Sequence, residues 1–286
     1  MTNRYRLLLL AVLLAAACYY VPAEQTETRE WSSTGITRIV AGTENGAISV
    51  SARADTGIQA LITRSCRGAD REDAEKHLAD IVVTDSTHGG TLFLQADMPD
   101  CNARSYGADF DIAAPAATAL DLTTSNGAVR IVGIVADITA RTSNGAMEAA
   151  NCAGAISMST SNGAVTLTST TGAAVIVTTN GRVTAAPHQG SIDARTTNGA
   201  MDCDLARFDT TDAATLHSSN GRVTVSLPAD ASVSFDAASS NGRVRVEGFS
   251  VNYTLNDVAH RRGTIGSGRA TLNITTSNGD VTIRPR

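Results

Sequence analysis

Residues 120–129 read Leu-Asp-Leu-Thr-Thr-Ser-Asn-Gly-Ala-Val, and the four-residue corner Thr/Ser-Ser/Thr-Asn-Gly within this stretch returns at fixed intervals of 18 residues. A constant interval of this length indicates a repeated structural unit. Four further Asn-Gly pairs begin at positions 45, 220, 241 and 278, outside the fixed interval. The five pairs that keep the interval are Asn126-Gly127, Asn144-Gly145, Asn162-Gly163, Asn180-Gly181 and Asn198-Gly199.

The residues between the corners repeat their type when the chain is written in rows of 18. Within each row the apolar positions are two residues apart, which is the period of a β-strand. Each row therefore predicts two short strands joined by an Asn-Gly corner. One apolar column before the corner holds Leu120, Ile138, Ile156, Ala174 and Ile192, and one after it holds Val129, Met147, Val165, Val183 and Met201.

Two all-β folds could use such rows. In an antiparallel meander, each Asn-Gly pair would form a type I′ hairpin turn. In a β-solenoid, each row is one coil, and asparagines of successive coils stack about 4.8 Å apart and bond to one another. We favour a β-solenoid with about 18 residues per coil, because a hairpin has no reason to keep the coil length constant. The glycine of each pair is expected to supply a positive φ at the turn.

The predicted organisation has four parts: a signal peptide at 1–18, a polar tether at 19–34, an N-terminal β cap at 35–115 and the repeat β-solenoid at 116–286. The cap contains one short helix, Asp70 to Ala79, which has an acidic first turn and a Lys and a His near its end. Beyond Asn198 the intervals lengthen to 22, 21 and 37 residues. Residues 207–214 and 249–268 are therefore expected to be loops, before a last coil at 270–284.

The N-terminus predicts export. Arg4 and Arg6 precede an apolar run of eleven residues that ends Ala-Ala-Ala before Cys18, too short for a bilayer span of about 20 residues. Small residues before a cysteine resemble a bacterial lipobox, although Ala15 stands where that pattern prefers Leu. We expect Cys18 to be lipidated and to anchor the protein to a membrane. The alternative is cleavage by an ordinary signal peptidase after Ala23, which would give a periplasmic or secreted protein.

The other four cysteines fall into two groups. Cys66 and Cys101 flank the strand-like runs of the cap, and an oxidising compartment would let them form a disulfide. Cys152 and Cys203 lie in different columns close to three coils apart, which is about 14 Å. A disulfide requires Cα atoms within about 7 Å, so these two thiols are expected to remain unpaired.

Several functions are disfavoured by the sequence. The net charge is −5 and there is no long basic run, so no nucleic acid partner is expected. Within 120–203, no two acidic residues occupy adjacent coils of one column, as the carboxylate pair of a glycosidase would. The five histidines lack metal-ligand spacing, and we expect no catalytic residue, metal or cofactor. Arg182, Arg222 and Arg243 each follow an Asn-Gly pair; ordinary solvent exposure is favoured over a basic track for an acidic glycan.

The corner motif also carries a family resemblance. After Pro228 the chain reads Val-Ser-Phe-Asp-Ala-Ala-Ser-Ser-Asn-Gly-Arg-Val, and near its end it reads Leu-Asn-Ile-Thr-Thr-Ser-Asn-Gly-Asp-Val. With residues 120–129, these stretches resemble the bacterial adhesin-like family known as domain of unknown function 4097, over roughly residues 36–286. The resemblance implies an envelope-exposed β-solenoid without an established enzyme activity.

Together these features predict a non-enzymatic, envelope-exposed protein with an adhesin-like binding or surface scaffold role. Its expected partners are a membrane, through the lipid, and an unidentified protein or glycan. One alternative is a structural or envelope-stress accessory lipoprotein without a small ligand, slightly favoured by the absence of aromatic residues from 120–203. A less expected alternative is a carbohydrate-active β-helix enzyme, which would need a groove lined by carboxylates.

Overall fold

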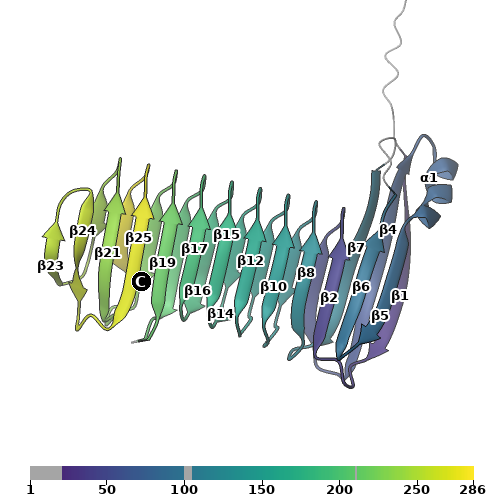
Figure 1. Ribbon diagram of the computed structural model, residues 1–286, viewed down its shortest axis with the longest axis horizontal. Helices are drawn as coiled ribbons and strands as arrows, with labels where there is room; N and C mark the ends of the chain where they lie inside the picture. Colours follow the sequence, from purple (N-terminus) through teal and green to yellow (C-terminus); the bar gives the residue numbers. More distant parts are fainter. Residues whose placement is uncertain (1–20, 100–104, 210) are drawn as a thin grey trace, which may run out of the picture.

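The computed structural model describes residues 21–99, 105–209 and 211–286, which form an elongated rod of two long β-sheets (Figure 1). In spatial order, the first sheet consists of β1 (Val21–Ser32), β4 (Gly57–Gly68), β7 (Ser105–Pro115), β3 (Ile48–Arg53), β9 (Val129–Val132), β11 (Met147–Ala150), β13 (Val165–Thr168), β16 (Val183–Gln189), β18 (Met201–Arg207), β20 (Val223–Leu227), β26 (Val281–Pro285) and β22 (Val244–Val246), with β14 (Thr170–Thr171) also paired to β16. The second sheet consists of β23 (Val251–Asn256), β24 (His260–Ile265), β21 (Val233–Ser239), β25 (Ala270–Thr276), β19 (Ala213–Ser218), β17 (Ile192–Thr196), β15 (Ala174–Thr178), β12 (Ile156–Thr160), β10 (Ile138–Thr142), β8 (Ala119–Thr124), β2 (Arg38–Thr43), β6 (Thr91–Asp97) and β5 (Val82–His88).

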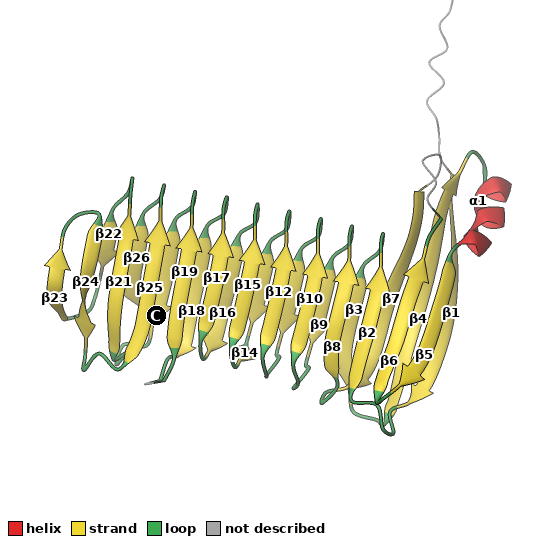
Figure 2. Cartoon of the chain, in the orientation of Figure 1, coloured by secondary structure: helices red, strands yellow, loops and turns green. Residues whose placement is uncertain are grey.

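Parallel pairing stacks the coils in the predicted register. Val129 lies opposite Met147 in the first sheet, and Ile138 lies opposite Ile156 in the second sheet. Each coil of the repeat therefore contributes one strand to each sheet (Figure 2). The prediction of an all-β solenoid is confirmed, and the antiparallel meander is wrong for the repeat because its strands run parallel.

The core is a thin layer between the two sheets. Every second side chain of a strand points inward, and large and small residues alternate along the stack, as in the buried column Ile131, Ala149, Leu167 and Ala185. Such a layer has little room for aromatic rings, which agrees with an aromatic content of only 4%. The buried ring of Phe235 lies in β21, near the C-terminal end of the rod.

Two ladders of hydrogen bonds hold the Asn-Gly corners together. From Asn126 onward, each carboxamide Nδ2 donates to the Oδ1 of the preceding asparagine in the stack, at 2.7–2.9 Å. Beneath them, in every coil after that of Thr43, a buried Thr or Ser hydroxyl donates to the glycine carbonyl of the neighbouring coil, as Thr160 does to Gly145 at 3.1 Å. The asparagine ladder runs in the order Asn45, Asn126, Asn144, Asn162, Asn180, Asn198, Asn220, Asn278 and Asn241.

The corner glycines are required for close packing of the coils. The prediction that they adopt a positive φ is wrong. None of the nine glycines that follow these asparagines has a φ between +20° and +160°. A Cβ on Gly163 would instead overlap the carbonyl oxygen of Gly145 in the coil below. Positive φ occurs at the opposite corner, where Gly154 and Gly172 have values of 122° and 121°.

The N-terminal boundaries of the prediction need correction. The proposed tether at 19–34 is wrong over the described residues, because Val21–Ser32 is a strand that pairs antiparallel with all of β4. The boundary at residue 116 is also wrong, because β2 and β3 already form a coil and Asn45 joins the asparagine ladder. The predicted helix is present as α1 (Arg71–His77), followed by a 3-10 turn (Leu78–Asp80), beside β1 and β4 (Figure 2). The predicted signal peptide at 1–18 lies outside the described residues.

The C-terminal end places its coils out of chain order. The coil of β25 and β26 comes last in the sequence, but it pairs with β19 and β20 on one side and with β21 and β22 on the other. Residues 249–268, predicted as a loop, contain the hairpin of β23 and β24, which extends the second sheet antiparallel to β21. The loop prediction failed because this segment pairs with a sheet edge that the linear row alignment does not reveal.

We expect Gly163→Ala to destabilise the protein more than Asn162→Ala. The added methyl group would overlap the Gly145 carbonyl oxygen and push two coils apart, and overpacking of this kind costs about 1–3 kcal/mol, occasionally more. Asn162→Ala removes two exposed side-chain hydrogen bonds that water can replace, so each should contribute near the lower end of about 0.5–1.5 kcal/mol and their loss should stay below the steric cost of the methyl group. Urea unfolding followed by circular dichroism measures both changes in the free energy of unfolding.

Gly57→Ala is the matched control, since the nearest heavy atom to a Cβ built on Gly57 is 3.7 Å away. Its free energy of unfolding should stay within about 0.5 kcal/mol of the wild type. Equal losses for Gly57→Ala and Gly163→Ala would contradict the steric role of the corner glycines.

Candidate functional site

The ten corner residues selected from the sequence lie in one row along an exposed edge of the rod. Their asparagine carboxamides bond to the same group in neighbouring coils, and their glycines lie against neighbouring backbone. This row is a structural site, because its polar side-chain groups bond to one another.

The carboxylates of the strict repeat also have partners on the rod itself. Asp137 Oδ1 accepts a hydrogen bond from the backbone N–H of Ala155 at 3.1 Å. The other four carboxylates lie beside guanidinium groups. A glycosidase needs two carboxyl groups that act together on one bond, and none of these ion pairs offers that arrangement. The four ion pairs are Asp121 with Arg141, Glu148 with Arg130, Asp193 with Arg195 and Asp202 with Arg182, at 3.5, 3.4, 2.8 and 3.1 Å.

The three arginines that follow Asn-Gly pairs do not make a continuous basic track. Arg182 is paired with Asp202. Arg222 and Arg243 flank Asp280, because the coil that contains Asp280 is inserted between their coils. The backbone N–H of Arg243 and the guanidinium of Arg245 hold the pKa of Asp280 below its usual value. Asp280 lies far along the sequence from Arg222 and Arg243, so the alignment in rows could not show that it is their neighbour.

Thr170 and His188 occupy equivalent buried positions at the second corner of successive coils. The row alignment places them in one column, but it does not show the hydrogen bond between them. His188 Nε2 lies 3.2 Å from the Ser191 carbonyl, which can only accept, so Nε2 carries the hydrogen; the neutral ring then accepts at Nδ1 from the Thr170 hydroxyl at 2.9 Å. His188 is fully buried, and burial lowers its pKa. The neutral ring is therefore a structural partner and is not placed to exchange protons with solvent.

The cysteines of the solenoid are unpaired, as predicted. Burial raises the pKa of Cys152 and raises that of Cys203 to about 12, so both remain thiols at neutral pH. Cys66 is buried on β4, whereas Cys101 and Cys18 lie outside the described residues. The Cys66–Cys101 disulfide and the lipidation of Cys18 therefore stay predictions.

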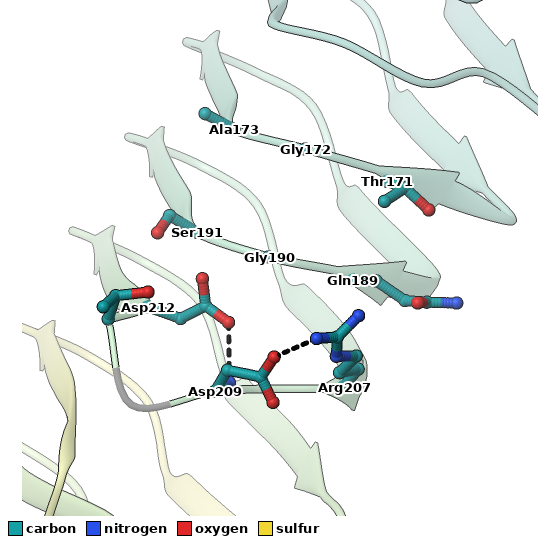
Figure 3. A pocket seen from close by; sticks show the side chains of 10 residues that line it. Thr171, Gly172, Ala173, Gln189, Gly190, Ser191, Arg207, Asp209 and Asp212 are labelled. Carbon is teal, nitrogen blue, oxygen red and sulfur yellow. Dashed lines mark hydrogen bonds and ion pairs between the residues drawn. The ribbon is translucent and has the colours of Figure 1, made fainter.

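A shallow polar hollow of about 390 Å³ lies at the second corner (Figure 3). Gly172 and Gly190 are among its lining residues, and their lack of side chains leaves this space open. At the rim, Arg207 pairs with Asp209 at 2.5 Å, and the backbone N–H of Asp209 donates to Asp212 Oδ2 at 2.6 Å. Both carboxylates are thus engaged within the loop, which disfavours a pair of acids acting on a substrate.

Two features are absent from residues 21–99, 105–209 and 211–286. Within these ranges, no three His, Cys, Asp or Glu side chains come together as metal ligands would. Over the same residues, no helix has both the length and the apolar character that a membrane span requires.

The fold and its corners define a repeat protein of the β-solenoid class. The family model described as Toastrack DUF4097 matches residues 153–284. This part of the chain is therefore similar to the DUF4097 family, as the repeated Asn-Gly corner predicts. A comparison with curated protein sequences gives no match.

Solved structures give distant similarities. A "putative adhesin" from Bacteroides fragilis is 14% identical, with 91% of this chain and 97% of that chain covered at a TM-score of 0.47. A "putative lipid binding protein" from Parabacteroides distasonis is 11% identical, with 90% and 96% covered at a TM-score of 0.41. A "putative adhesin" from Parabacteroides distasonis is 6% identical, with 90% and 97% covered at a TM-score of 0.36. These descriptions apply to those proteins.

We expect the protein to lose stability as the pH falls, in part through His188. Burial lowers the pKa of His188 in the folded state below the ordinary histidine value of about 6.5, which the unfolded chain keeps. The unfolded state therefore binds a proton first, and the free energy of unfolding decreases as the pH drops below about 6.5.

Urea unfolding between about pH 5 and pH 7.5 measures this dependence around the ordinary histidine pKa. His188→Leu should flatten the curve, whereas Asn162→Ala, which removes no titratable group, should lower the curve without changing its slope. Parallel curves for the wild type and His188→Leu would show that His188 does not carry the effect.

Proposed function

We propose that this protein is an exported, non-enzymatic module of the bacterial envelope that acts as a binding or scaffold rod. The observation that carries the proposal is the internal pairing of the polar groups on the solenoid. Its asparagines bond to asparagines, and the carboxylates of the strict repeat bond to arginines or backbone. A surface whose polar groups are paired with one another is better suited to a role that depends on shape and rigidity than to catalysis on a substrate.

The start of β1 supports lipidation of Cys18 over cleavage after Ala23. Val21, Pro22 and Ala23 pair with the last residues of β4, and Ala23 is buried. Cleavage after Ala23 would remove these three residues from the sheet, whereas cleavage before Cys18 keeps the whole strand. An acyl anchor on Cys18 would then hold the N-terminal end of the rod close to a membrane.

A structural accessory lipoprotein without a small ligand is the second candidate function. It is favoured by the strict repeat, whose outward columns carry no aromatic residue and no continuous run of one charge. Such a surface has few of the side chains that dominate binding hot spots, Trp, Tyr and unpaired Arg. The two candidates share the export and anchoring steps and differ in whether the rod has a ligand.

The anchoring step predicts that Cys18 carries the acyl chains. Cells grown with a clickable fatty acid should yield a labelled wild-type protein in the membrane fraction, because two or more chains give stable attachment. Cys18→Ala should be unlabelled and retained as precursor or released as soluble protein. Cys152→Ala, at a buried thiol, is the control and should stay labelled. An unlabelled wild-type chain that begins at Glu24 would establish the secreted alternative instead.

A further inference from the structure

A second hollow, also of about 390 Å³, lies at the N-terminal end of the rod. It is formed where the turn at 33–36 meets the β5–β6 turn at 88–91, and the backbone N–H of Thr37 donates to the Gly90 carbonyl at 2.8 Å across this junction. Its volume lies within the range of small-molecule sites, about 300–1,000 Å³. The hollow is lined by Trp31, Ser32, Thr34, Thr87 and His88 together with three glycines.

The indole of Trp31 is fixed in this hollow before any ligand arrives. Its Nε1–H donates to Asp85 Oδ2 at 2.9 Å, and Asp85 Oδ1 is paired with Arg29 at 2.6 Å. Trp31 is half-buried and packs partly against the core. Because Trp31 lies on β1 and Asp85 on β5, this contact also joins the outer strands of the two sheets. A rigid aromatic ring loses little conformational entropy when a ligand binds.

The surroundings of Trp31 are polar but carry little net charge. Ser32 Oγ donates to Thr34 Oγ1 at 3.1 Å, and both residues are exposed. A Cβ built on Gly35 or on Gly89 would meet no heavy atom within 4 Å, so the space beside these two turns is open. Arg29 pairs with both Asp85 and Glu27, and Arg64 also pairs with Glu27, so two guanidinium groups balance two carboxylates and remove a reason to favour a charged ligand.

We propose that this hollow binds a neutral sugar, as a monosaccharide or the end of a glycan. The C–H face of a sugar ring is apolar and fits the face of an indole, while its hydroxyls can exchange hydrogen bonds with Ser32, Thr34 and the glycine backbone. The inference deepens the binding role proposed above, because it names the ligand class and locates its site. A purely structural accessory would have no such ligand.

The test uses the fact that Trp31 is the only tryptophan of the chain. The mature protein, purified from membranes in detergent, is titrated with glucose, galactose, N-acetylglucosamine and their disaccharides while intrinsic fluorescence is followed. Binding should give a saturable change in emission and protection from acrylamide quenching for at least one sugar. The inference would be overturned if none of these sugars gave a saturable change up to about 10 mM. Such a result would mean a binding free energy less favourable than roughly −3 kcal/mol.

Variants separate the hollow from the rest of the rod. Ser32→Ala with Thr34→Val keeps the fluorescent ring and should weaken binding about tenfold, the equivalent of 1.4 kcal/mol for the hydrogen bonds lost. Tyr253→Phe, at the opposite end of the rod, should bind like the wild type. Equal affinity in all three proteins, or tighter binding of glucuronic acid than of glucose, would count against the site. Neither outcome affects the anchoring proposal, which fatty-acid labelling tests separately.

Discussion

The close approach of backbone at the Asn-Gly corner is the constraint on which the rest of the rod depends. At this corner the glycine of one coil lies against the glycine carbonyl of the next, and any Cβ would force the coils apart. Once glycine has brought the coils to strand spacing, the asparagine above it and the threonine beside it can both reach the neighbouring coil. The two ladders and the parallel strand pairing therefore depend on the same small residue, which explains why Gly recurs without exception at this position.

A stack of parallel strands must also end without inviting further stacking, because an unpaired strand edge is a template for another chain. At the N-terminal end, β1 is a long edge strand that carries Glu24, Glu27 and Glu30, and α1 lies beside it. At the C-terminal end, β22 has only three residues and β23 has a bulge between Tyr253 and Leu255. Charge, a short strand and a bulge are three established ways to protect an edge.

The strict part of the fold could be predicted from sequence because equal spacing puts equivalent residues side by side. Val129 and Met147 occupy the same position in successive 18-residue rows, and they therefore lie side by side in the sheet. The ends could not be predicted this way, since their coils are stacked out of chain order and antiparallel strands are added. The same limit applies to the candidate sites. Asp280 beside Arg222, and Asp85 beside Trp31, are contacts between segments whose order in the sequence does not match their order in the stack.

The position of the Trp31 hollow bears on the kind of glycan that it would meet. Trp31 lies near the end of β1, ten residues after Val21, so roughly 33 Å of strand separates the start of β1 from the proposed sugar site, and the proposed anchor Cys18 precedes Val21 by three residues. The β23–β24 hairpin lies at the opposite end of the rod from β1, so it is the part farthest from the proposed anchor (Figure 1). If Cys18 carries the anchor, a sugar site at the same end of the rod is suited to glycans of the cell's own envelope, whereas a site for ligands on another cell would be better placed at the opposite end.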